Sequence, residues 1–359
     1  MTQKKKLQLH DIDTKVLVDS GDDTSSEENS SEDSSSDETS SEDSSSDESS
    51  DESSEDSSNE DSSSEEESDV DCKKMKKEDE SSDEELDIDS KKIEQETWTI
   101  TFSEAVENHN SMQVIGTKAK EGATVSELKD IYKTFTKKGC KCQLIDLDPI
   151  LPSKIRKNAK YGAQLLIVRG GIKLLAKDYN ALIKEVKSSK KIVDKKVWMR
   201  GRVVNKLARH NLCYADKAQK ADYENKKGTI VAFKSVPQLN YVRSSIGKMF
   251  GSKKYKNLFA ELNYYYDIKK CGLNFHGDFE RRIVIGLRFG ATMNLQYQWY
   301  YKSEPVGKRV ILQFNEGDFY IMSDKATGND WKRKIIPTLR HSAGCKKYTP
   351  ESTKGSIYY

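Results

Sequence analysis

His276 and Asp278 lie two positions apart in this sequence. Of all its residues, these two have the types and the spacing best suited to chemistry. They stand just before an apolar, β-branched run, residues 282–287, and side chains two apart on a strand point to the same side. They can therefore bind one metal ion together. His341 is the only histidine later in the chain. Two histidines and one carboxylate form the facial triad of non-haem Fe(II) oxygenases, so the sequence predicts a metal site of these three residues.

Further segments accompany this H-x-D in a fixed order. Upstream lie Asn263 and Tyr265, which form an N-x-Y, and before them Arg209, Tyr214 and Asp216. Downstream, the H-x-D extends to HGDFER, and the chain then reads LRFGA and GDFYIM. These segments and their order resemble the AlkB-like family of 2-oxoglutarate/Fe(II)-dependent dioxygenases, its viral-type members in particular, over more than a third of the chain.

The resemblance implies a double-stranded β-helix, or jelly roll, as the catalytic domain, with Fe(II) bound by His276, Asp278 and His341. It also implies that Asn263 and Tyr265 bind 2-oxoglutarate and that O₂ is the second cosubstrate. In this family, conversion of 2-oxoglutarate to succinate and CO₂ accompanies hydroxylation of a C–H bond. A hydroxylated N-methyl group then leaves as formaldehyde.

The chain departs from the family at the cation that faces 2-oxoglutarate. Family members carry arginines on a final strand, whereas only lysines follow His341 here. The distal carboxylate needs a cation nearby, and we expect either Lys354 or Arg288 to provide it. Arg288 belongs to an otherwise apolar strand and shares a face with Val284 and Gly286.

The resemblance also implies substrate contacts for Arg209, Tyr214 and Asp216, with the ring of Tyr214 suited to stack on a base. A structural turn explains these three residues equally well. Glu280 and Arg281, just past the metal pair, are expected at the mouth of the pocket or, alternatively, on a solvated strand edge.

Other candidate sites have no partners that converge in the sequence. His109, in the run ENHN, is expected to be a surface or capping histidine. Cys140 and Cys142 are spaced too closely for a usual zinc site.

The six scattered cysteines indicate free thiols, and no signal-peptide core or transmembrane stretch is present. We therefore expect a soluble, intracellular, non-secreted protein without a membrane partner.

Charge is strongly segregated along the chain. Residues 1–90 hold 34 acidic and 8 basic side chains, a net of −26. The totals are 59 acidic and 60 basic residues, which leaves 25 and 52, a net of +27, for residues 91–359. A basic body favours a polyanionic partner, DNA or RNA, although solvated basic faces explain the same charge.

The predicted organisation has three parts. Residues 1–95 form a disordered acidic tail of serine, aspartate and glutamate, which is open to phosphorylation or able to fold back on the basic body. Residues 96–190 form a small α+β domain of unknown role, and residues 191–359 form the jelly-roll dioxygenase domain. The overall class is α+β.

Sequence periodicity predicts the elements of the two folded parts. In the first part we expect strands at 97–102, 143–147 and 163–168 and helices at 125–137 and 179–186. In the second we expect one helix at 235–250 and strands at 198–204, 283–289, 295–301, 309–314, 318–322 and 338–341.

The sequence thus predicts an enzyme that dealkylates or hydroxylates nucleic-acid bases. One alternative is a hydroxylase or demethylase of protein side chains. Another is a non-catalytic, basic nucleic-acid-binding protein built on a barrel that has lost its activity.

Overall fold

The structure is a computed structural model and describes residues 95–359. The predicted acidic tail, residues 1–95, lies outside the described residues except for its last residue. The described residues form a mixed α+β fold built mostly of strands, as the sequence predicts. None of their helices is long and apolar enough to cross a membrane.

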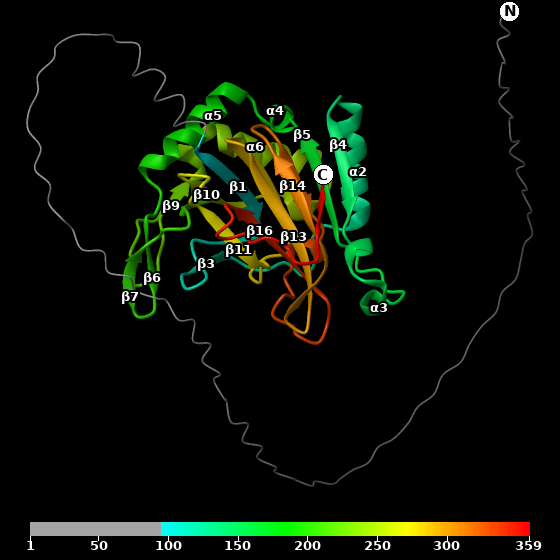
Figure 1. Cartoon of the computed structure of the whole chain (residues 1–359). Coiled ribbons are helices and arrows are strands. Elements are labelled where there is room, and N and C mark those ends of the chain that lie inside the picture. Colours follow the sequence, from blue (N-terminus) through cyan, green and yellow to red (C-terminus); the bar gives the residue numbers. More distant parts are fainter. Residues whose placement is uncertain (1–94) are drawn as a thin grey trace, which may run out of the picture. The chain divides into compact units, whose positions relative to one another are not determined.

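The larger sheet has eight strands, and β1 lies near its middle (Figure 1). Its strands, in spatial order, are β4 (Lys141–Asp146), β5 (Gln164–Arg169), β15 (Phe319–Met322), β12 (Val284–Gly290), β1 (Thr97–Ser103), β10 (Phe259–Tyr265), β8 (His210–Ala215) and β9 (Ile230–Ala232).

The second sheet has five strands and contributes two strands to the site described below. In spatial order they are β11 (Gly272–His276), β16 (Thr338–Gly344), β13 (Met293–Tyr301), β14 (Glu304–Phe314) and β17 (Ser356–Tyr358). Two hairpins complete the strands, β2 (Ala105–Glu107) with β3 (Val114–Gly116), and β6 (Lys196–Met199) with β7 (Arg202–Asn205).

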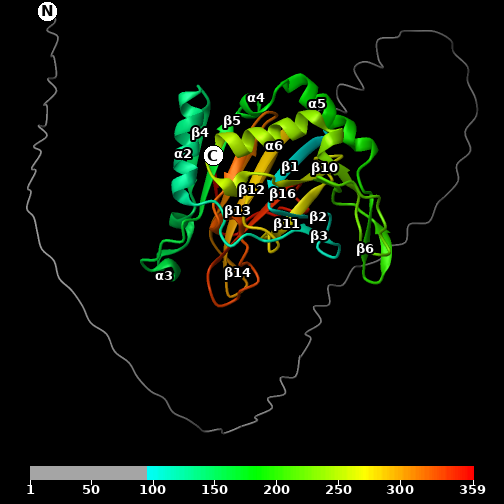
Figure 2. The ribbon, with the colours of Figure 1, turned by 180° about the vertical axis from the view of Figure 1, so that it is seen from behind.

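Helices cover one face of the eight-stranded sheet, and Figure 2 shows α6 lying across it. The α-helices are α2 (Val125–Lys137), α3 (Ser153–Arg156), α4 (Ile172–Leu175), α5 (Tyr179–Ser188) and α6 (Pro237–Met249). Short 3-10 helices span Asp148–Ile150, Ser189–Lys191, Phe233–Ser235, Lys253–Tyr255 and Lys325–Thr327.

The alternation along β1 explains how the sheet serves two purposes. Trp98, Ile100 and Phe102 are fully or almost fully buried and belong to the core shared with the helices. The intervening Thr99 and Thr101 face the opposite side, where they line a cavity. Because side chains alternate on a strand, one face of the sheet packs against helices while the other is free to carry polar groups.

A second core joins the two sheets. Val284 and Tyr320 of the larger sheet pack in it with Leu295, Trp299 and Leu339 of the smaller one. The Trp299 indole N–H donates to the Leu147 carbonyl oxygen at 2.7 Å, so this buried polar group is satisfied. This core therefore joins the two sheets next to a cavity that Val284, Leu295 and Tyr320 also line.

The predicted division at residue 190 is wrong. β1, β4 and β5 come from the predicted small domain, yet they are strands of the same sheet as β8, β10, β12 and β15. β1 pairs with β10 on one edge and with β12 on the other. Residues 96–190 therefore supply a central strand and covering helices to a shared core.

Most predicted elements are confirmed, and one is wrong. The helix at 125–137 is confirmed, with Thr124 and Glu127 forming a capping box at its start. The strand predicted at 198–204 is instead the hairpin of β6 and β7. Its turn contains Arg200 and Gly201, both with positive φ, and this turn reverses the chain.

The central position of β1 makes a testable prediction. Replacing Ile100 by alanine removes a fully buried side chain from the shared core and should lower the free energy of unfolding by about 2–5 kcal/mol in one cooperative transition. Chemical denaturation of the full chain measures this. The control Val114→Ala, at a half-exposed position, should change the free energy by less than about 0.5 kcal/mol. Two separate transitions, with only one shifted by Ile100→Ala, would contradict the shared core.

Candidate metal centre and its cavity

The pairing of β11 with β16 sets two histidines side by side. His276 is the last residue of β11 and lies directly opposite His341 in the antiparallel register. A β-bulge between Leu273 and His276 shifts the register and re-aims the end of β11. The two imidazole rings meet edge to face, with their centroids 4.5 Å apart.

Asp278 is held in place by its backbone. Its N–H donates to the Thr327 carbonyl oxygen at 3.0 Å. Gly277 permits this approach, because a Cβ at that position would lie 2.0 Å from the Gly328 carbonyl oxygen. Only glycine fits between the two predicted ligands, and it brings the Asp278 carboxylate under the imidazoles.

The three side chains converge on one point. The Nε2 atom of His276 lies 3.6 Å from Asp278 Oδ1, and that of His341 lies 3.8 Å from the same oxygen. All three ligand atoms lie within 4.8 Å of one another. His276 Nδ1 donates to the Asn274 carbonyl oxygen at 2.7 Å, so its Nε2 carries the free lone pair. A second hydrogen bond of this kind is how proteins orient a metal-binding histidine.

Electrostatics keeps these groups in the protonation states that a cation requires. Burial lowers the pKa of His341 to about 3, and the neighbouring His276 adds to the effect, so the ring is neutral at physiological pH. Burial would raise the pKa of Asp278, but the His341 ring, which is charged only at the low pH where this carboxyl titrates, and the Arg281 guanidinium outweigh it and hold that pKa below its ordinary value. The centre thus combines a neutral imidazole with an ionised carboxylate.

The centre opens into a cavity of about 500 Å³ between the two sheets. From the larger sheet, the polar face of β1, β10 and β12 lines it. Thr99 pairs with Asn263 on one side and with Arg288 on the other, so these three side chains form one row across the sheet. From the smaller sheet, His341 and Ala343 line the cavity.

Arg288 is a buried cation that has no counterion among residues 95–359. Its side chain is 2% exposed, and its Nη1 donates to the Thr99 hydroxyl at 2.8 Å. Its Nε has no hydrogen-bond partner, and no described carboxylate forms an ion pair with it. An uncompensated buried charge is costly, so this guanidinium is well placed to receive an anion from the cavity.

Asn263 lies at the cavity, but its amide is already engaged. Its Oδ1 accepts from Arg209 Nε and from Asn211 Nδ2, each at 2.5 Å. Its Nδ2 donates to Glu261 at 3.1 Å. Asn263 therefore fixes the Arg209 guanidinium beside the buried ring of Tyr265, which also lines the cavity.

The neighbouring part of the cavity, next to Asn263, is acidic. Arg281 is 5% exposed and donates to Glu261 at 2.6 Å and to Glu280 at 2.5 Å. Glu107, at the end of β2, joins these groups in the cavity lining. Burial raises the pKa of Glu107 to about 8, and the negative charges of Glu280 and Glu261 add to the effect. Three carboxylates thus share one guanidinium.

Three of the residues predicted for the site lie elsewhere. Tyr214 is 2% exposed and packs in the helical core against Phe233, so it cannot stack on a base. The Asp216 side chain is exposed and forms an ion pair with Arg243 at 2.6 Å. Lys354 lies in an exposed turn before β17 and does not line the cavity. None of these three residues lines the cavity.

The remaining predicted residues gather around the cavity: Arg209, Asn263, Tyr265, His276, Asp278, Glu280, Arg281, Arg288 and His341. The sequence analysis missed Glu107, Glu261 and Thr99, and it placed His109 on the surface, whereas His109 also lines the cavity. The sequence did contain a signal for Thr99, because it is one of the polar positions in the alternating run TWTITF. Nothing local in the sequence links the β2–β3 hairpin to the metal centre.

No family model matches this chain. It is 42% identical over 255 residues to the uncharacterized protein R156 of Acanthamoeba polyphaga mimivirus. The matched region covers 71% of this chain and 98% of the relative.

The raised pKa of Glu107 predicts a pH-dependent effect on stability. Between about pH 4.5 and pH 8 the carboxyl group ionises in the unfolded chain but resists ionisation in the folded one, so it destabilises the fold increasingly as pH rises. Glu107→Gln should therefore match the parent near pH 4.5 and be more stable by at least about 1 kcal/mol near pH 8, after allowance for partial exposure.

Denaturation at several pH values measures this difference. The exposed Glu304→Gln serves as the control and should show no such trend. A Glu107→Gln advantage that stays constant or shrinks as pH rises would contradict the acidic cluster.

Proposed function

We propose that this chain, which belongs to the same family as the mimivirus protein R156, is an Fe(II)- and 2-oxoglutarate-dependent dioxygenase of the AlkB-like type that dealkylates or hydroxylates nucleic-acid bases. The observation that carries the proposal is the convergence of His276, Asp278 and His341 at one wall of a cavity.

The donor set suits Fe(II). Two imidazole nitrogens and one carboxylate oxygen leave further coordination positions open, as non-haem iron oxygenases require. When bound with 2-oxoglutarate and O₂, the iron supplies the oxidising chemistry. The protein's own part is to hold Asp278 ionised, to keep His341 neutral and to fix the His276 ring through the Asn274 carbonyl.

We assign the distal carboxylate of 2-oxoglutarate to Arg288. This guanidinium is the buried cation of the cavity that lacks a counterion, and a carboxylate can accept two parallel hydrogen bonds from it. Arg209 lies on the same side of the cavity, fixed by Asn263, and Tyr265 lies with them. These positions support a dianionic ligand there and explain why no arginine is needed after His341.

A jelly roll accounts for the strand order. From β10 to β16 the chain moves between the two sheets, with β10, β12 and β15 in the larger one and β11, β13, β14 and β16 in the smaller one. An eight-stranded jelly roll requires one further strand in the larger sheet. β17 instead pairs with β14, and β1 lies between β10 and β12. We infer that β1, at the start of the described residues, supplies the eighth strand.

The acidic part of the cavity favours a cationic group at the oxidised atom. Glu261 and Glu280 outnumber Arg281 there even while Glu107 is protonated, and an N-alkylated base that carries a positive charge fits this balance. The +27 of residues 91–359 favours a polyanionic chain around it. The same carboxylates also suit a methylated lysine, so a protein demethylase is the second candidate.

The first prediction from the proposed function concerns the metal ligands. His276→Ala, Asp278→Ala and His341→Ala should each reduce iron- and 2-oxoglutarate-dependent succinate formation by more than about 100-fold, because each removes a direct ligand. Succinate quantification by mass spectrometry measures this. The matched control His210→Gln alters a histidine that stacks on Tyr266 outside the cavity and should retain the activity. Full activity in the three ligand variants would contradict the assigned centre.

The second prediction concerns the cosubstrate. Arg288→Met should raise the Kd for 2-oxoglutarate at least about 30-fold, since it removes one partner of a buried charge pair, while metal affinity stays unchanged. Calorimetric titration of the metal-free protein with Mn(II) measures the metal affinity, and titration of the loaded protein with 2-oxoglutarate measures the second Kd. The Kd of Arg288→Lys for 2-oxoglutarate should lie between those of the parent and Arg288→Met. Lys354→Ala is the control and should bind like the parent. A loss of 2-oxoglutarate binding in Lys354→Ala alone would reverse the assignment.

Substrate panels separate the two candidate functions. Formaldehyde release from methylated oligonucleotides, with none from methylated peptides, is the expected result. Release from the peptides alone would transfer the proposal to protein demethylation and leave the metal and cosubstrate assignments intact.

A further inference from the structure

Phe279 is an exposed aromatic residue next to a metal ligand. It directly follows Asp278, yet its side chain is 52% exposed. Two ammonium groups lie over its ring as cation–π contacts, Lys118 Nζ at 4.8 Å and Lys332 Nζ at 4.2 Å from the centroid. Lys118 Nζ also donates to the Phe279 carbonyl oxygen at 2.6 Å. An open ring flanked by two cations has no role in the core, so its position calls for another explanation.

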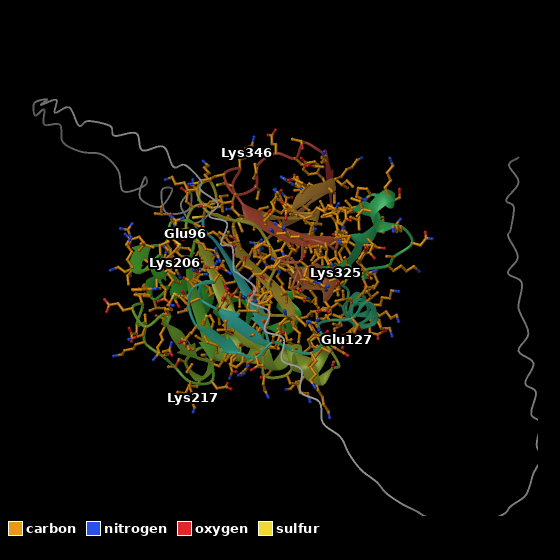
Figure 3. The ribbon with its side chains drawn as sticks, turned by 90° about the horizontal axis from the view of Figure 1, so that it is seen from below. Glu96, Glu127, Lys206, Lys217, Lys325 and Lys346 are labelled. Carbon is orange, nitrogen blue, oxygen red and sulfur yellow. The ribbon has the colours of Figure 1, made fainter. Side chains whose placement is uncertain are left out.

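A second cavity, of about 550 Å³, adjoins the first at this ring. Phe279 and Lys332 line both cavities. The second cavity is further lined by Thr124 at the start of α2 and by Arg282 and Lys325. Figure 3 shows Lys325 and Glu127 of α2 on the same side of the described residues. A chain that leaves the metal-containing cavity for the second one must pass over Phe279.

The charges of the second cavity do not cancel. Arg282 pairs with Asp324 at 3.4 Å, and Lys325 pairs with Asp330 at 2.5 Å. These pairs use both carboxylates that line this cavity.

Two basic side chains of the second cavity are left over. Lys332 and Arg333 are exposed, line the cavity and form no ion pair with any described carboxylate. The second cavity is therefore basic, while the first has an acidic part built from Glu107, Glu261 and Glu280.

This pair of cavities matches the alternation of charge in a nucleotide chain. Bases are neutral, or cationic when alkylated, and each is followed by an anionic phosphate. Proteins that bind single strands combine aromatic rings, on which bases stack, with basic side chains that follow the backbone. A peptide offers no regular anion next to each side chain, so the second cavity favours nucleic acid.

We propose that Phe279 and the second cavity bind the nucleotide next to the oxidised base of a single strand. The neighbouring base stacks on Phe279, and the phosphates beside it contact Lys332 and Arg333. This inference rests on the proposed nucleic-acid function and names the residues that hold the strand outside the metal-containing cavity.

Binding of single strands by the metal-free protein tests the inference separately from catalysis. The full chain, with a chelator present, is titrated against fluorescent single-stranded DNA and RNA about ten nucleotides long, and anisotropy is recorded at several salt concentrations. Phe279→Ala should weaken binding about tenfold at every salt concentration, because stacking is lost but no charge is removed. Phe279→Trp should retain the affinity.

The charge variant has a different expected pattern. Lys332→Ala/Arg333→Ala should reduce the slope of log Kd against log salt by about 1.4, the value for two lost contacts to single-strand phosphates. The matched control Lys137→Ala/Lys138→Ala removes two exposed cations at the far end of α2 and should leave the slope unchanged. Thermal unfolding of each variant verifies that it folds.

Several outcomes would overturn the inference. If the parent binds the strands while Phe279→Ala and Lys332→Ala/Arg333→Ala bind within twofold of it, the strand takes another path and the proposed function stands. If the control pair loses as much as the test pair, the basic surface acts without a defined site. If the parent binds no strand even at low salt, the inference and the nucleic-acid substrate both fall, while succinate formation still tests the iron chemistry.

Discussion

The register between β11 and β16 is the constraint on which the proposed active site depends. It places His276 opposite His341, and the bulge before His276 turns the end of β11 inward. Gly277 then lets the chain pass against Gly328, so that Asp278 reaches the same point. A one-residue slip of this pairing would send one imidazole to the other side of the sheet. The candidate metal centre therefore depends on the pairing of these strands and on one glycine.

The larger sheet carries a polar face inside the protein, and this has an energetic cost. Thr99, Asn263 and Arg288 form a row where apolar side chains would pack better, and no carboxylate in the described part of the chain pairs with Arg288. The opposite face offsets the cost with a continuous core, in which Ile100 and Phe319 are fully buried. Natural proteins accept such local violations of good packing mainly where a ligand binds.

Local patterns in the sequence were sufficient for part of this architecture. The apolar periodicity of residues 125–137 indicated α2, and alternation in the run TWTITF indicated that β1 is a strand. The spacing of His276 and Asp278 indicated a metal site because the residues are neighbours in the chain. His341 lies far along the sequence, but it was the last histidine left to complete the set.

Contacts between distant segments could not be read in the same way. β1 pairs with strands more than 150 residues later, which is why a separate N-terminal domain was predicted wrongly. The β2–β3 hairpin brings Glu107 and His109 to the cavity through tertiary packing alone. Tyr214 matched a motif, yet its neighbours on β8 turn it toward the helices. A motif specifies residue types, whereas the side of the sheet to which a strand residue points depends on how the whole sheet is paired.

The most direct test of the central claim is an anaerobic calorimetric titration of the metal-free, full-length chain with Fe(II), followed by 2-oxoglutarate. The account predicts that one Fe(II) binds per chain and that 2-oxoglutarate binds only after the iron is present. A chain that binds no Fe(II), or that binds 2-oxoglutarate equally well without the metal, would contradict it.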